Sequence, residues 1–206
     1  MEDQALRESL CRGAAQLWMR GLIVGDGGLV STEAGRRRFL VTPLGRRRSG
    51  LRPEELLLVD IGGADVAGGP GIPPQLWRPH RLAYQSLRDN DADHPVDHPP
   101  VHATVLATPP SAMALALLHP DMPLLQCASF GPAMGLEPDE QRLHALDAGD
   151  EPALRDALLH QRIVLLRGLG VLTAAGTLEE ALNLIEGVEY AASLTLACAG
   201  QRVPRP

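Results

Sequence analysis

The chain has 206 residues, a length that suits one domain with a substantial core, and we expect residues 1–206 to form a single domain. Hydrophobic residues make up 45% of it but aromatic residues only 3%, so that core must consist of aliphatic side chains. The net charge of -6 argues against general nucleic-acid binding, and no apolar run approaches the roughly 20 residues that span a membrane.

The basic residues exclude two kinds of chemistry. All 19 of them are arginine, and the sequence contains no lysine. Lysine-dependent aldolases and pyridoxal enzymes need a side-chain amine for a Schiff base, and a Walker A phosphate loop also needs lysine. The acidic start of the chain does not resemble a secretory signal, and three scattered cysteines suit reduced thiols. We therefore expect a cytoplasmic protein.

Hydrophobic periodicity and turn residues predict the elements of the first half. A helical stripe of Leu6, Leu10, Ala14, Leu17 and Trp18 predicts a helix over 5–20 that ends at Gly21. The elements expected after it are strands at 29–31 and 39–42, a helical turn at 52–55, a strand at 56–60, a loop at 65–74 and a helix at 76–87. Pro79 must lie in the first turn of that last helix to be tolerated.

The second half continues the alternation. We expect an exposed loop at 89–100, strands at 101–107, 163–166 and 171–173, and helices at 109–118, 152–160 and 177–199. A capping box of Thr177 and Glu180 starts the last helix. Helices that interleave with short strands indicate an α/β sandwich with a mixed or antiparallel sheet.

Five segments, in order, resemble the class II aldolase/adducin family, which includes sugar-phosphate aldolases, a ribulose-phosphate epimerase and a dehydratase of methionine salvage. Residues 51–60 are similar to the family's "LTPEDLVVVD", and residues 40–45 to its "ITPSG" turn. The other three segments are the glycine-rich stretch 20–28, the strand and helix at 103–116, and residues 165–181. The resemblance implies a three-layer α/β/α sandwich with a mixed, largely antiparallel central sheet, and a homo-oligomer, often a tetramer.

The positions that the resemblance assigns to zinc hold other residues. The family's metal site takes two histidines from "HTHSP" and one from "NHG", with a carboxylate from "SSE" nearby. These positions are Leu106, Thr108, Leu169 and Leu76 in this chain. Leucine offers zinc no donor atom. We therefore expect no bound zinc, no catalytic residue from the family's set, and an apolar pocket where the site would be.

The phosphate cradle that the resemblance implies is altered in the same way. Its asparagine becomes Leu29, its turn serine Leu44, and its paired serines Pro74 and Gln75. The residues that remain as candidates for binding a ligand are Gly27, Gly28, Thr42, Arg46, Arg47 and Arg48. Guanidinium groups bind phosphate and carboxylate well, but a charge run is also typical of a solvated hairpin edge. The same two interpretations hold for Arg36–Arg38, and we expect His80 to pack or cap rather than catalyse.

A second candidate metal site is His94, His98 and His102, which are four residues apart among several aspartates. Histidines at that spacing can share a metal on a helix, but Pro95, Pro99 and Pro100 make a helix improbable here. The alternative is a solvated loop.

Three functions follow as hypotheses. The first is a non-catalytic binding or regulatory relative. The second is an aldehyde-lyase or other lyase with relocated metal chemistry, held by the inserted histidines. The third is a partner subunit for an aldolase paralogue. None of them involves nucleic acid or a membrane.

Overall fold

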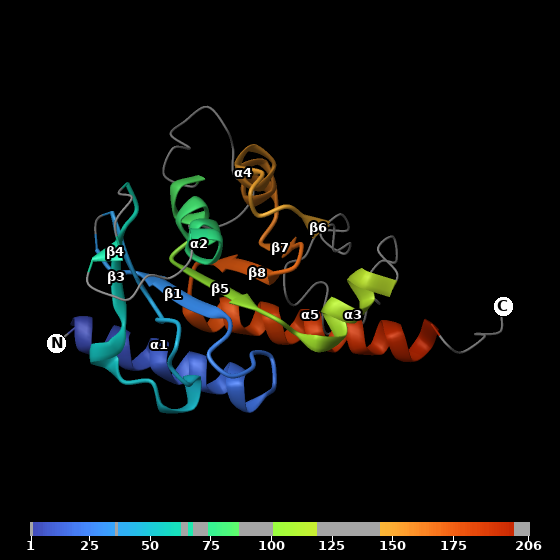
Figure 1. The fold of residues 1–206 in the computed structure, drawn as a ribbon, viewed down its shortest axis with the longest axis horizontal. Coiled ribbons are helices and arrows are strands. Elements are labelled where there is room, and N and C mark those ends of the chain that lie inside the picture. The colour runs from blue at the N-terminus through green and yellow to red at the C-terminus, as the bar shows by residue number, and fades with distance from the viewer. Residues whose placement is uncertain are drawn as a thin grey trace.

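One sheet organises the part of the chain that this computed structural model describes, residues 2–35, 37–62, 66–67, 74–86, 101–118 and 145–199 (Figure 1). The helices are α1 Glu2–Met19, α2 Pro74–Ser86, α3 Pro110–Leu118, α4 Glu151–His160 and α5 Leu178–Ala199, with short 3-10 turns η1 Arg48–Gly50 and η2 Pro53–Glu55. The strands are β1 Leu29–Glu33, β2 Arg38–Val41, β3 Leu57–Asp60, β4 Val66–Ala67, β5 Ala103–Ala107, β6 Ala145–Leu146, β7 Ile163–Leu166 and β8 Gly170–Ala175.

The sheet has eight strands in the order β4-β3-β2-β1-β5-β8-β7-β6. The β6–β7 pair is parallel and the other pairs are antiparallel, so the sheet is mixed and largely antiparallel, as predicted. Its centre is β5, whose five residues are all buried. In the register of the central strands, Leu106 of β5 lies opposite Leu29 of β1 and Leu172 of β8.

Helices cover both faces of the sheet. In Figure 1, α2 and α4 lie above it, and α1, α3 and α5 lie below it. Because side chains alternate along a strand, the sheet separates two apolar clusters. One contains Leu10 and Leu17 of α1 with Leu115 and Ile185, and the other contains Leu82 of α2 with residues of α4. The predicted three-layer α/β/α sandwich is confirmed.

Local sequence placed most elements within a few residues, with some exceptions. Trp18, expected on the buried stripe of α1, is 36% exposed, whereas Leu17 in the same turn is fully buried. Pro79 is the sixth residue of α2 and therefore lies past its first turn. The expected loop at 65–74 contains the short strand β4, while the expected loop at 89–100 lies outside the described residues. Cys198 is exposed, and Cys11 is partly buried.

The last helix begins as the sequence predicts. Thr177 Oγ1 accepts a hydrogen bond from the Glu180 backbone N–H at 3.1 Å, which is the N-terminal half of a capping box. The Glu180 carboxylate turns instead to Arg162, whose Nη1 lies 2.5 Å away. Within the described part of the chain, no helix has both the length and the apolar character needed to cross a membrane.

Candidate functional site

The carboxyl end of β5 is the place where the segments with family-like spacing converge. Leu106 is 1% exposed there and is flanked in the sheet by Leu29 and Leu172. The same apolar cluster includes Leu44, Leu76 and Leu169, partly buried and packed against its edge. Five leucines from distant parts of the sequence therefore share one cluster on the α2 and α4 side of the sheet. They are Leu29, Leu44, Leu76, Leu106 and Leu169.

Two glycines bring the backbone close at this end of β5. A Cβ on Gly170 would stand 2.1 Å from the carbonyl oxygen of Ala107, and one on Gly28 would stand 2.8 Å from that of Leu106. Both glycines also have positive φ, 141° and 66°, where a side chain is disfavoured. The Thr108 methyl group is 3.3 Å from the same Gly170 position, so Thr108 lies beside the turn that carries Leu169.

This arrangement has little capacity to hold a metal. Leucine side chains supply no lone pair, and the hydroxyl of Thr108 is a weak neutral donor compared with imidazole, thiolate or carboxylate. Within residues 2–35, 37–62, 66–67, 74–86, 101–118 and 145–199, no group of three or more His, Cys, Asp or Glu side chains could hold an ion. The residues at the positions that resemble the zinc ligands do not fit zinc.

Next to this cluster, Arg48 joins the glycine-rich loop to the turn that follows β2. Its side chain is fully buried, and every one of its five guanidinium N–H groups donates to a backbone carbonyl. The acceptors belong to Asp26, Gly27, Gly28, Pro43 and Arg46. Burial lowers the pKa of Arg48 to about 10, so the group keeps its charge at neutral pH.

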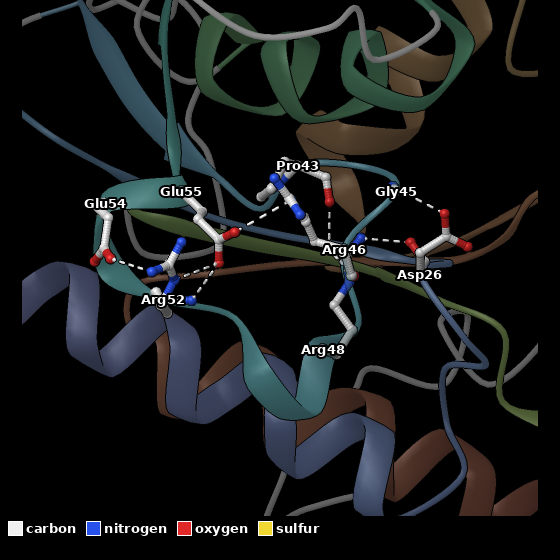
Figure 2. Close-up of polar contacts among 8 residues, drawn as sticks. All are labelled: Asp26, Pro43, Gly45, Arg46, Arg48, Arg52, Glu54 and Glu55. Atoms are coloured by element: carbon white, nitrogen blue, oxygen red, sulfur yellow. Dashed lines mark hydrogen bonds and ion pairs between the residues drawn. The ribbon is translucent and has the colours of Figure 1, made fainter.

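A second contact ties the same two segments. The Asp26 carboxylate accepts a hydrogen bond of 2.9 Å from the Gly45 backbone N–H (Figure 2). Arg46 points the other way, toward Glu55, with an Nε–Oε1 distance of 3.2 Å (Figure 2). Arg47 is exposed. The three consecutive arginines therefore differ in their surroundings. Arg48 is buried and holds the two loops together, and we call it the Arg48 clamp, while Arg46 and Arg47 lie on the surface.

The remaining candidates for ligand binding also have internal partners. Thr42 is buried, and its Oγ1 accepts from the Val30 N–H at 3.1 Å. The carbonyl oxygens of Gly27 and Gly28 accept hydrogen bonds from Arg48. Carbonyl oxygens that bind the Arg48 guanidinium thus line the space between the two loops. Such a lining suits a guanidinium better than a phosphate, because an anion needs N–H groups directed at it.

A buried polar group on the α2 side of the sheet was not evident from sequence. Ser31 Oγ lies 2.8 Å from His80 Nδ1, 2.9 Å from Tyr84 Oη and 2.7 Å from Thr104 Oγ1. All four side chains are buried. The available signal was Ser31 beside the apolar residues of β1 and a threonine in the otherwise apolar β5. His80 therefore packs in the core, as expected.

Desolvation determines the ionisation of His80 and Tyr84 in this buried cluster of polar side chains. It lowers the pKa of His80 to about 3 and raises the pKa of Tyr84 above its ordinary value. Among the described residues, His80 Nε2 has no hydrogen-bond partner. The imidazole is therefore neutral at physiological pH, and charging it would place an ion inside the core.

His102 lies at the other end of β5 from Leu106. Its Nδ1 is 2.6 Å from Glu33 Oε2, and its side chain is about half exposed. Four residues along a strand separate it from Leu106 by roughly 13 Å. His94 and His98 lie outside the described residues, as does Arg36. Of the three histidines, His102 is thus separate from the leucine cluster.

Anion binding by the turn after β2 is testable through its two exposed arginines. If Arg46 and Arg47 bind an anion, sulfate at ten times its dissociation constant should raise the melting temperature by about 3–5 °C. Arg47→Ala should abolish the shift, while Arg167→Ala, an exposed arginine in the β7–β8 turn, should keep it. Thermal melts with sulfate and with a sugar phosphate measure it. A wild-type protein indifferent to both would support the solvated edge.

Known proteins resemble the chain in both sequence and fold. The sequence model of the "Class II Aldolase and Adducin N-terminal domain" matches residues 8–196. No curated protein matches the chain.

Several solved structures share the fold. YgbL from Escherichia coli superposes with a TM-score of 0.78 at 22% identity, covering 98% of this chain and 94% of that one. The L-fuculose-1-phosphate aldolase from Thermus thermophilus gives 0.73 at 24%, covering 96% and 98%. A sugar-phosphate aldolase from Thermotoga maritima gives 0.71 at 15%, covering 98% and 99%. At these identities the likeness concerns the fold alone.

Proposed function

The chain belongs to the class II aldolase and adducin family, and on that premise we propose that it is a non-catalytic binding relative. In this proposal the family's zinc ligands and catalytic carboxylate have been replaced, and the scaffold has been kept for recognition. A shared scaffold supports such an assignment only by analogy, so the residues of the site itself must support it.

One observation carries the proposal. The positions that resemble the zinc ligands, the catalytic carboxylate and two phosphate contacts contribute five leucines to one apolar cluster. A zinc ion, when bound, would act as a Lewis acid that stabilises an enediolate. An apolar cluster can neither ligate that ion nor stabilise the charge that develops on such an intermediate.

The Arg48 clamp supports the same proposal independently. A phosphate held by the glycine-rich loop would need backbone N–H groups and an open space between the loops. Carbonyl oxygens line that space instead, and a buried guanidinium fills it. In this proposal, the described residues provide neither the metal half nor the phosphate half of a sugar-phosphate lyase site.

The proposal extends to assembly and location. We propose a cytoplasmic homo-oligomer, by likeness to the family, or a mixed oligomer with an aldolase paralogue. Light scattering of the purified protein distinguishes a monomer from an oligomer, and co-purification from the native host tests the paralogue.

The direct test is a lyase assay beside metal analysis. The dialysed protein should hold far less than one zinc per chain, and added zinc should give no cleavage of L-fuculose 1-phosphate above buffer. The Thermus thermophilus aldolase serves as the positive control. About one tightly held zinc per chain, or turnover that a chelator removes, would overturn the proposal and favour the lyase with relocated metal chemistry.

Restoring the family's residues should restore zinc binding. Leu76→Glu, Leu106→His, Thr108→His and Leu169→His together should raise zinc affinity by roughly 100-fold or more, because three imidazoles and a carboxylate are a sufficient ligand set. Isothermal titration with zinc measures it. Polar groups in the leucine cluster should cost about 1–3 kcal/mol each in stability until metal binds.

A matched control separates ligation from polarity. Leu76→Gln, Leu106→Asn, Thr108→Asn and Leu169→Asn place amides at the same positions and should gain no zinc affinity. Should the four-fold variant fail to fold, Thr108→His with Leu169→His changes two partly buried neighbours, leaves the buried Leu106 in place and should still gain weak binding. Equal zinc affinity in the histidine and amide variants would mean that these positions do not converge on one site.

A further inference from the structure

A groove lies on the opposite side of the sheet from the leucine cluster, and the proposed loss of catalysis does not involve it. It has a volume of about 920 Å³ and runs between the first half of α1 and the β1–β2 hairpin. That volume is in the range of pockets that hold small organic molecules. In Figure 1, this part of α1 passes beneath β3, near the N-terminus.

The described floor of the groove is aliphatic. It is lined by Leu6 of α1, Ala34 of the hairpin and Leu58 of β3. All three are partly exposed and pack against the apolar cluster on the α1 side of the sheet. Three aliphatic groups from separate elements form a surface on which the apolar body of a ligand would lose contact with water.

The described rim is charged, with arginine in the majority. Arg7 and Arg38 both line the groove, and Glu33 is the single carboxylate among the lining residues that the structure describes. Glu33 is engaged by His102 at 2.6 Å. Arg7 is positioned by a hydrogen bond from Nη1 to the Pro53 carbonyl at 3.1 Å, and Arg38 is exposed at the start of β2.

Rigid backbone supports these groups. The hairpin closes with hydrogen bonds from the Ala34 N–H to the Arg38 carbonyl at 2.8 Å and from the Arg38 N–H to the Gly35 carbonyl at 3.4 Å. The Glu33 N–H donates to the His102 carbonyl at 2.8 Å, which fixes the hairpin to the start of β5. These hydrogen bonds hold the described residues of the hairpin wall in place, which reduces the ordering that binding to them would require.

We propose that this groove binds an organic anion with an apolar body, its carboxylate paired with Arg38 and its aliphatic part on Leu6, Ala34 and Leu58. Guanidinium forks pair well with carboxylates, and the apolar floor selects against small inorganic ions. The ligand class follows from charge and floor together, because neither a neutral alkane nor a bare anion would satisfy both.

The test uses octanoate as the probe in isothermal titration calorimetry of the full chain. One saturable site is expected, with acetate and octanol each binding at least about ten-fold more weakly, since each lacks half of the recognised chemistry. Arg38→Gln should weaken octanoate at least five-fold, and Leu58→Asn should do the same. Arg167→Gln, in the distant β7–β8 turn, should bind as the wild type does.

Three results of these titrations would overturn the proposal. They are binding of octanoate without saturation, binding of octanol as tight as that of octanoate, and an unchanged affinity for octanoate in Arg38→Gln. A second copy of the chain in the groove would show as an Arg38-dependent elution volume without octanoate binding, which also overturns it. If Leu58→Asn does not fold, the test relies on Arg38→Gln, which changes an exposed residue. None of these results depends on zinc or lyase activity, so ligand binding in the groove and the proposed loss of catalysis are tested separately.

Discussion

Arg48→Ala should lower the free energy of unfolding by about 3–5 kcal/mol and the melting temperature by roughly 6–20 °C. The side chain satisfies five backbone carbonyls in two loops, and each carbonyl left without a donor in a buried place costs on the order of 1–3 kcal/mol. Water entering the cavity will recover part of that cost. Urea unfolding followed by circular dichroism measures the change.

Neighbouring substitutions show whether the effect belongs to the clamp. Arg47→Ala removes the adjacent, exposed arginine and should change stability by no more than about 0.5 kcal/mol. Arg48→Lys should give an intermediate loss, because an ammonium has three donors and cannot reach all five carbonyls. A loss below about 1 kcal/mol in Arg48→Ala would mean that the guanidinium exchanges readily with solvent.

Acidification should destabilise the fold through His80. Its folded pKa is about 3, against about 6.5 in an unfolded chain. Above pH 6.5 the imidazole is neutral in both states and contributes nothing. Between these two values only the unfolded state takes up the proton, so stability should fall by about 1.4 kcal/mol for each pH unit below 6.5.

A difference measurement isolates this histidine from the carboxylates that also titrate in acid. His80→Asn keeps a polar group near the position of Nδ1 and removes the titration, so the slope of stability against pH from 6 to 4 should be shallower than in the wild type. His160→Asn, an exposed histidine at the end of α4, should leave the slope unchanged. Parallel slopes in all three proteins would show that His80 takes up its proton without unfolding.

Periodicity predicted the elements well because local sequence determines them. The aliphatic run of β5, the stripe of α1 and the Thr177 cap each carry their own signal, and each element is present. The three-layer order could be expected from family resemblance, but the register that places Leu29 beside Leu106 is a tertiary fact. Sequence indicated that these positions were apolar, and the structure adds that they share one cluster.

Arg48 marks the limit of sequence-based reasoning at the candidate site. Three consecutive arginines look alike in sequence, and a charge run predicts a solvated surface. Which of the three is buried depends on carbonyl groups supplied by a loop some 20 residues earlier in the chain. The polar group around His80 was missed for the same reason, since its members come from β1, α2 and β5.

The two close glycines at the end of β5 have a consequence for how such a chain can diverge. Gly28 and Gly170 leave no room for a methyl group against the carbonyls of Leu106 and Ala107. If catalysis has been lost as proposed, an imidazole could be replaced by a leucine without moving the backbone, whereas replacing either glycine would require the end of β5 to be rebuilt. A glycine-based motif in such a chain therefore reports the geometry of the backbone and not the presence of an activity.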